Sequence, residues 1–327
     1  MKSLIVAAGL AMLPFAAGAA VITNGNVMLG VTETGALNTY EGTPSPVYGT
    51  IATGLRFTPT GNEATAHGCL CEGWGVGIGD TGAWGGNGGD NTGGPVNLSV
   101  VSFASTATTA KSVVDLASGG LRVTHDFALS TKTNNLFRVE VSITNTSGQA
   151  IKDLRYTRAM DWDIEPTPFN EFSTIQGTAA AKTVRYADDN GFASTNPFGG
   201  RNPIASGAVG DFVDAGPNDH GAIFDFGFGE LGAGDTFTFD IFYGGASTET
   251  EALLALSKVG AEVYSLGQSS LDKDGNGGDR LNTFIFGFAR VGGQAVQTPS
   301  EVPVPATAGL LMGGLGLLGA VRARRRA

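Results

Sequence analysis

The feature that most constrains the fold is an alternation of apolar and polar residues with a period of two. In FRVEVSITN (137–145), the apolar residues Phe137, Val139, Val141 and Ile143 are separated by single polar residues. Because side chains of a strand alternate between two faces, this pattern predicts a strand with one apolar face. Four further segments show the same alternation: LRVTHDFAL (121–129), LRYTRAMDWDI (154–164), TFTFDIFYG (236–244) and TFIFGFARV (283–291). Such strands are typical of antiparallel sheets that pack face to face.

Glycine content favours the same fold class. The chain has 51 Gly among 327 residues, which disfavours a mostly helical protein, and the glycines lack the three-residue period of collagen. One short helix is expected at 249–265, with Thr248 and Glu251 as a capping box and Gly267 at its end. The turn residues 145–148 (NTSG) predict a hairpin between their flanking strands. We therefore expect one large, two-sheet antiparallel sandwich domain at 21–295.

The N-terminus has the features of a secretory signal peptide. Lys2 precedes an apolar stretch at 4–15, and Ala17-Gly18-Ala19 supplies the small residues of a cleavage site. We expect residues 1–20 to be a signal helix that is removed after Ala19 or Ala20. The protein is then exported.

The C-terminus predicts a second targeting segment after a linker at 296–301. A Val-Pro-Val-Pro-Ala motif precedes an uncharged stretch at 307–321, and a cluster of arginines follows at once. The uncharged stretch is shorter than the ~20 residues of a full membrane span, but short segments insert with local thinning of the bilayer. The arginines are expected to stay on the cytoplasmic side. The motif consists of Val302, Pro303, Val304, Pro305 and Ala306, and the cluster of Arg322, Arg324, Arg325 and Arg326.

This tail resembles the PEP-CTERM sorting signal, and most closely its Val-Pro-Leu-Pro-Ala variant from Gram-negative bacteria. Val304 replaces the usual Leu, and the Glu of Pro-Glu-Pro is missing. The resemblance covers residues 302–327 alone. It implies recognition by an exosortase-type membrane enzyme, a membrane-anchored precursor, and a final location at the cell surface or in the exopolysaccharide matrix.

The charge of the body limits its partners. Residues 21–301 keep 15 of the 20 Lys and Arg and all 30 Asp and Glu, which gives a net charge of −15. An acidic body repels nucleic acid and anionic lipid. It suits divalent cations or neutral polysaccharide.

A glycine-rich segment at 73–94 contains Trp74 and Trp84 beside acidic and amide groups. We expect a long loop there. Its tryptophans either contact a glycan, because an aromatic face packs on the apolar face of a sugar, or pack against the sandwich.

The only cysteines, Cys69 and Cys71, lie in the sequence HGCLC with His67. In an exported, oxidising compartment they can form a disulfide. The alternatives are two free thiols, or a soft metal site that includes His67. Of the two other histidines, His125 is expected in the apolar core and His220 in a polar turn.

Two groups of acidic residues are candidate sites. Asp161, Asp163 and Glu165 alternate along one strand and its exit, and they are either a catalytic carboxylate pair or a solvated acidic face. Asp272, Asp274, Asn276 and Gly277 match the opening of an EF-hand calcium loop. Its twelfth position is Thr283, so Asp279 is the expected substitute for the missing Glu. The segment is either a weak Ca²⁺ site or a solvated turn before the strand at 283–291.

Two functional hypotheses follow. The first is a non-catalytic surface or matrix protein that associates with polysaccharide. The second comes from the order of segments, in which NGNVMLGV (24–31) is followed by FRVEVSITNTSG (137–148) and an aromatic–acidic strand. This order resembles the β-supersandwich domains of carbohydrate-active proteins, and the resemblance implies a hydrolase or lyase. Carboxylates that converge with Trp74 or Trp84 in a cleft would favour the second hypothesis.

Overall fold

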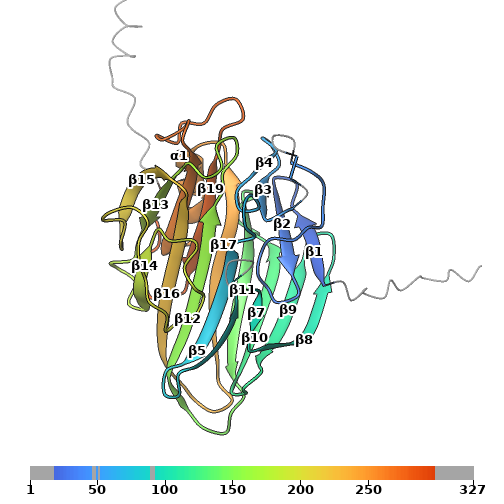
Figure 1. The fold of residues 1–327 in the computed structure, drawn as a ribbon, viewed down its shortest axis with the longest axis vertical. Coiled ribbons are helices and arrows are strands. Elements are labelled where there is room, and N and C mark those ends of the chain that lie inside the picture. The colour runs from blue at the N-terminus through green and yellow to red at the C-terminus, as the bar shows by residue number, and fades with distance from the viewer. Residues whose placement is uncertain (1–17, 46–48, 51, 89–92, 299–327) are drawn as a thin grey trace, which may run out of the picture. The chain divides into compact units, whose positions relative to one another are not determined.

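Antiparallel strands make up most of the fold, as the two-residue alternation predicts. The computed structural model describes residues 18–45, 49–50, 52–88 and 93–298 (Figure 1). In β11 (Leu136–Asn145), Val139, Val141 and Ile143 are fully buried, and the residues between them are half-buried. The expected all-β class with one short helix is confirmed for the described residues.

The largest sheet has nine strands in the order β15-β13-β18-β19-β17-β11-β10-β9-β8. Besides β11, its strands are β8 (Leu98–Ser105), β9 (Ala110–Leu116), β10 (Leu121–Leu129), β13 (Glu171–Gln176), β15 (Phe212–Asn218), β17 (Thr236–Ala246), β18 (Val263–Ser269) and β19 (Thr283–Ala289). Every pairing in it is antiparallel.

A second sheet has six strands in the order β14-β16-β12-β5-β6-β7. Its strands are β5 (Glu72–Ile78), β6 (Ala83–Asn87), β7 (Pro95–Val96), β12 (Ile151–Trp162), β14 (Val184–Asp188) and β16 (His220–Leu231). This sheet packs face to face on the nine-stranded sheet. Tyr156 of β12 meets Phe239 of β17 edge-on with ring centroids 5.0 Å apart, and Phe224 of β16 meets Phe286 of β19 at 5.5 Å.

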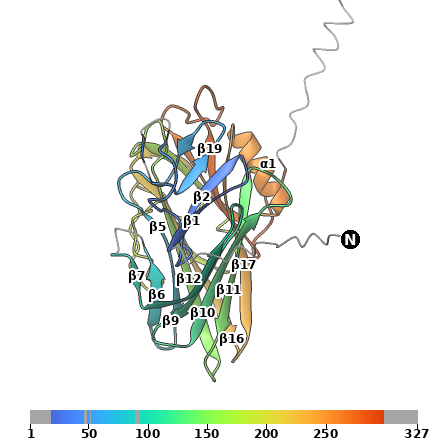
Figure 2. The ribbon, with the colours of Figure 1, turned by 90° about the vertical axis from the view of Figure 1, so that its right-hand side faces the viewer.

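A third sheet corrects the expected two-sheet architecture. Its four strands are β1 (Ala19–Thr23), β2 (Val27–Thr32), β3 (Leu55–Phe57) and β4 (Asn62–Glu63), in that order. All four are labelled in Figure 1, and Figure 2 shows β1 and β2 from the side. Ile22, Leu29 and Leu55 are fully buried and belong to the same apolar core as the two large sheets. The small sheet therefore extends one core, and the described residues up to Gln297 belong to one compact unit.

The connection at 145–148 is not a hairpin. It joins β11 of the nine-stranded sheet to β12 of the six-stranded sheet, because β11 pairs with β10 and β17, whereas β12 pairs with β5 and β16. The turn residues therefore carry the chain from one layer of the sandwich to the other. The alternation predicted both strands but not the sheet to which each belongs.

The helix α1 (Glu249–Val259) begins as predicted and ends early. The Thr248 hydroxyl accepts a hydrogen bond from the Glu251 amide at 3.2 Å, which is the expected cap. Gly260 then adopts a φ of 69° and ends the helix, so the predicted end at Gly267 is wrong. Gly267 lies instead in β18.

A buried polar network lies between the two large sheets. The Arg158 guanidinium forms a 2.5 Å ion pair with Glu72, and the Tyr243 hydroxyl donates to the same carboxylate at 3.0 Å. The His125 ring nitrogen Nε2 lies 3.0 Å from the Tyr156 hydroxyl. All five side chains are fully buried, and the expected core position of His125 is confirmed.

The two predicted targeting segments lie largely outside the described residues. Residues 1–17 of the signal peptide are not described, and neither is any residue of the sorting segment at 302–327. Within the described ranges, no helix has the length and apolar character needed to span a bilayer.

Candidate functional site

The acidic residues at the end of β12 are buried. Asp161 is 1% exposed, and Asp163 and Glu165 are 0% exposed, so the interpretation as a solvated acidic face is wrong. The reason is the position of β12 in the centre of the six-stranded sheet, with the nine-stranded sheet on one side. On the other side the backbone of Gly191 lies directly against Asp161. Period-two alternation therefore does not leave a solvent-facing side here.

Three carboxylates converge at this place. Carboxylate oxygens of Asp161, Asp163 and Asp219 all lie within 4.8 Å of one another. Asp219 is the single residue between β15 and β16, and it is exposed. We call these three residues the carboxylate cluster. It brings together the exit of β12 and the connection between β15 and β16, where the chain passes from the nine-stranded to the six-stranded sheet.

The buried oxygens of the cluster have no hydrogen-bond partners. Neither carboxylate oxygen of Asp163 is bonded, and neither is Oδ1 of Asp161. No Lys or Arg of the described chain forms an ion pair with either residue. Glu165 differs, because its oxygens accept hydrogen bonds from the Ser45 hydroxyl at 2.5 Å and the Glu63 amide at 3.0 Å. Glu165 therefore lies outside the cluster.

The surroundings strongly favour protonated carboxyl groups when no cation is bound. Burial, followed by the charges of Asp219 and Glu63, raises the pKa of Asp163 to about 8. Burial and the neighbouring Asp163 charge raise the pKa of Asp161 well above its usual range. Burial also raises the pKa of Glu171, the first residue of β13, to about 9. Removing protons from this group would place several negative charges together in a poorly hydrated region.

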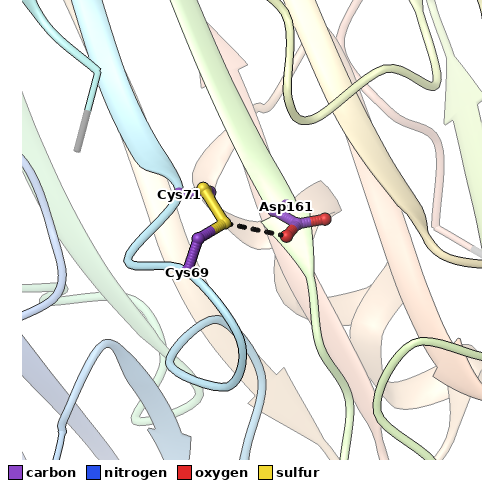
Figure 3. Close-up of side chains that lie close together, drawn as sticks. All are labelled: Cys69, Cys71 and Asp161. Carbon is purple, nitrogen blue, oxygen red and sulfur yellow. Dashed lines mark hydrogen bonds between the residues drawn. A yellow bond between two sulfur atoms is a disulfide. The ribbon is translucent and has the colours of Figure 1, made fainter. Parts of the chain in front are cut away.

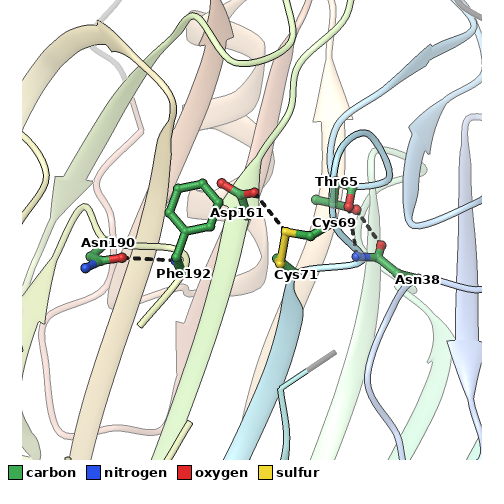
Figure 4. Close-up of a disulfide and its surroundings, with 7 residues drawn as sticks. All are labelled: Asn38, Thr65, Cys69, Cys71, Asp161, Asn190 and Phe192. Carbon is green, nitrogen blue, oxygen red and sulfur yellow. Dashed lines mark hydrogen bonds between the residues drawn. A yellow bond between two sulfur atoms is a disulfide. The ribbon is translucent and has the colours of Figure 1, made fainter. Parts of the chain in front are cut away.

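The predicted pairing of Cys69 with Cys71 is present as a disulfide next to the cluster (Figure 3). The Cys69 sulfur lies 3.6 Å from Oδ2 of Asp161. A disulfide sulfur carries no proton, so only a protonated Asp161 can donate in this contact. Figure 4 shows Asp161 between the disulfide and Phe192.

The soft metal site with His67 is not formed in this state. The two sulfurs are bonded to each other, and Nε2 of His67 lies 2.8 Å from Oε1 of Glu165. The other histidine expected outside the core, His220, is not in a polar turn. It begins β16, is fully buried, and lies 2.8 Å from the Asp189 carboxylate.

The predicted glycan contact of Trp74 is wrong. Trp74 is fully buried in β5, where its indole N–H donates to the Thr34 carbonyl at 2.9 Å and its ring lies 4.6 Å from that of His125. The glycine-rich segment is mainly a hairpin of β5 and β6, not a long loop. Trp84 is half-buried in β6, so a glycan contact by Trp84 stays a prediction.

The predicted calcium loop does not gather its four ligands. Asp272 is buried, and its carboxylate accepts a hydrogen bond from the Gly277 amide of its own loop at 3.0 Å. Asp274, Asn276 and Asp279 are exposed. None of the loop's aspartates belongs to a group of converging ligand atoms within the described ranges. Calcium binding by this loop stays a prediction.

Sequence reasoning identified Asp161 and Asp163 but missed Asp219 and Glu171. Asp219 stands next to His220 in GPNDHG, where a turn residue gives no sign of its spatial neighbours. The sequence signal that could have located Asp219 was the strand pattern on both sides of this turn. Asp219 directly precedes β16, and β16 pairs with β12, which brings Asp219 to Asp161.

Fold and site together define an all-β antiparallel sandwich with a buried carboxylate cluster. No protein-family model matches the chain, and no curated protein matches it. Among solved structures, the chain is similar to a candidate aldose 1-epimerase from Escherichia coli K12, with 11% identity and a TM-score of 0.30. The alignment covers 85% of this chain and 92% of the other. This likeness is too low to support any statement about fold or function.

Proposed function

We propose that the chain is an exported, non-catalytic protein of the cell surface or extracellular matrix of a Gram-negative bacterium. The observation that carries the proposal is the order of the tail, in which the motif at 302–306 is followed by an apolar stretch and by four arginines. An exosortase-type enzyme would process this tail, and the apolar stretch would hold the precursor in the membrane. The signal-peptide features of residues 1–20 are consistent with the same route.

Two properties of the body support this location. The Cys69–Cys71 disulfide suits an oxidising compartment, because disulfides persist outside the cytosol. The net charge of −15 over residues 21–301 favours contact with neutral polysaccharide or divalent cations over nucleic acid. Polysaccharide association is therefore part of the proposal.

Mass spectrometry of the protein from the envelope and matrix fractions tests the route. We expect a mature form that starts at Ala20 or Val21 and, if the tail is removed, ends near residue 306. Replacement of both motif prolines, Pro303 and Pro305, by Ala should leave the protein in the membrane with Arg326 retained. Pro299→Ala is the matched control, because Pro299 lies outside the motif. A cytosolic form that retains both Met1 and Arg326 would exclude the proposal.

A carbohydrate-active hydrolase or lyase on a supersandwich-like fold is the second candidate. The convergence of carboxylates with raised pKa values favours it, because glycoside hydrolysis uses such pairs. Two facts oppose it. Asp161 and Asp163 are buried, and Trp74 lies inside the core with its ring against His125 and Tyr156. Release of reducing sugar or unsaturated product from bacterial polysaccharides, lost in Asp163→Asn, would establish the enzyme and exclude the non-catalytic proposal.

A further inference from the structure

Unpaired carboxylates in the interior need a partner. Asp163 is fully buried with both oxygens unbonded, and Oδ1 of Asp161 is likewise buried and unbonded. Burying an ionised carboxylate without compensation is costly, and proteins that bury such groups pair them or use them as metal ligands. The described residues offer no cationic side chain to either group. A partner from solution would satisfy these oxygens.

We propose that the carboxylate cluster is a divalent-cation site with Asp161, Asp163 and Asp219 as ligands, and that Ca²⁺ is the ion that fits it. The spacing agrees with a single ion. Oxygens bound to one Ca²⁺ at about 2.3–2.6 Å can lie at most about 5 Å apart. The oxygens of the cluster lie within 4.8 Å of one another, so one ion between them can reach all three.

The chemistry of the donors selects a hard cation. All three side chains offer carboxylate oxygens, the ligands that Ca²⁺ and Mg²⁺ prefer. Both nearby sulfurs are bonded to each other in the disulfide, so they do not supply thiolates for zinc or copper. Mg²⁺ gives up its water reluctantly, whereas two of the three ligands here are almost fully buried. Ca²⁺, which accepts protein oxygens more readily, is the better match.

Asp219 gives the site an entrance. It is the exposed member of the cluster, and it lies in the turn between β15 and β16 with a carboxylate oxygen within 4.8 Å of the two buried carboxylates. A cation arriving from solvent would meet Asp219 first and then displace protons from Asp161 and Asp163. Once bound, it would connect the turn at Asp219 to the end of β12. The inference goes beyond the proposed function and does not depend on the targeting segments.

Isothermal titration calorimetry of the full purified chain, first freed of metal with EDTA, tests the site with CaCl₂ and MgCl₂. We expect one Ca²⁺ per chain, bound more tightly than Mg²⁺. Asp163→Asn should abolish binding. Asp219→Asn should weaken Ca²⁺ binding at least about tenfold. Loss of a residue that only hydrogen-bonds a metal ligand already lowers metal affinity by about 10–100-fold. Because Asp219 is exposed, its variant keeps the test valid if Asp163→Asn fails to fold.

The double variant Asp272→Asn/Asp274→Asn is the matched control, because it removes two acidic groups from the other candidate loop. Retained binding in this control, with loss in the cluster variants, supports the proposal. Absence of Ca²⁺ binding to the unaltered chain would overturn it. So would binding that survives Asp219→Asn unchanged but disappears in the control. Equal or tighter binding of Mg²⁺ would overturn the assignment of calcium.

Discussion

Asp163→Asn should stabilise the calcium-free protein at neutral pH, although it changes a fully buried residue. Asparagine has nearly the same shape but needs no proton to be neutral, whereas Asp163, with a pKa of about 8, must take one up on folding. The new amide can also donate to Oδ1 of Asp161, which has no partner. An unsatisfied buried group costs about 1–3 kcal/mol, so we expect a gain of that size in the free energy of unfolding.

The gain is large enough to measure by thermal unfolding. An unfolding entropy of about 2.1 cal/mol/K per residue gives about 0.6 kcal/mol/K for the roughly 270 residues between β1 and β19, so Tm should rise by roughly 2–5 °C in EDTA. Calcium should raise the Tm of the unaltered protein and not that of the variant. At ten times Kd it stabilises the unaltered protein by about 1.4 kcal/mol, or roughly 2 °C, and leaves the variant unchanged.

The pH dependence gives a second check on the same variant. Below the unfolded pKa of about 4, Asp163 is protonated in both the folded and the unfolded protein and does not oppose folding. As the pH rises toward the folded pKa of about 8, the unaltered protein loses this stability, because folding then requires uptake of a proton. The advantage of the variant in EDTA should therefore shrink as the pH falls from 7 toward 5. Asp126→Asn, on an exposed pair with Lys111, is the control and should change little. A variant that loses more than about 1 kcal/mol in EDTA, as ordinary core substitutions do, would refute the reasoning.

Two further predictions concern the network between the sheets. Glu72→Gln should lower the free energy of unfolding by about 3–5 kcal/mol in urea titrations, because it leaves the buried Arg158 without its counter-ion. Addition of Arg158→Met should restore much of the loss, and a double variant as unstable as the single one would contradict this explanation. Burial and the Arg158 charge hold the pKa of His125 well below its usual 6.5. Stability should therefore fall by up to about 1.4 kcal/mol per pH unit below about pH 6.5, and His125→Gln should remove that slope; equal slopes in both proteins would contradict the assignment.

The strands were predictable because local alternation reflects burial on one side, as in β11. The sheet to which a strand belongs was not, since β11 and β12 are consecutive but lie in different layers. The strand β5 was missed, although the sequence carries a strand pattern there. Trp74, Val76 and Ile78 alternate with glycines and are all buried. Glycine is required there, since a Cβ on Gly75 would lie 1.9 Å from the Thr195 carbonyl oxygen.

The candidate site was half predictable. Asp161 and Asp163 stood out as alternating acids, but their burial depends on Gly191 and other residues that pack against β12 from a distant part of the chain. Asp219 joins them only through the pairing of β16 with β12. Local patterns identify the acidic residues, whereas long-range pairing determines their environment and therefore their chemistry. The loop at 272–279 shows the converse, because a familiar spacing did not produce converging ligands.

The strand β12 places a guanidinium and carboxyl groups on opposite faces of one sheet. Arg158 points toward Tyr243 of the facing sheet, and Asp161, three positions later and hence on the other side, points toward the disulfide. The pairing of Arg158 with Trp74 and Phe224 fixes this arrangement. Deletion of one residue between 158 and 161 would turn the guanidinium and the carboxylates to the same side. An arginine on that side could then pair with Asp161, so the absence of a cationic side chain from the proposed ion site is a consequence of strand register.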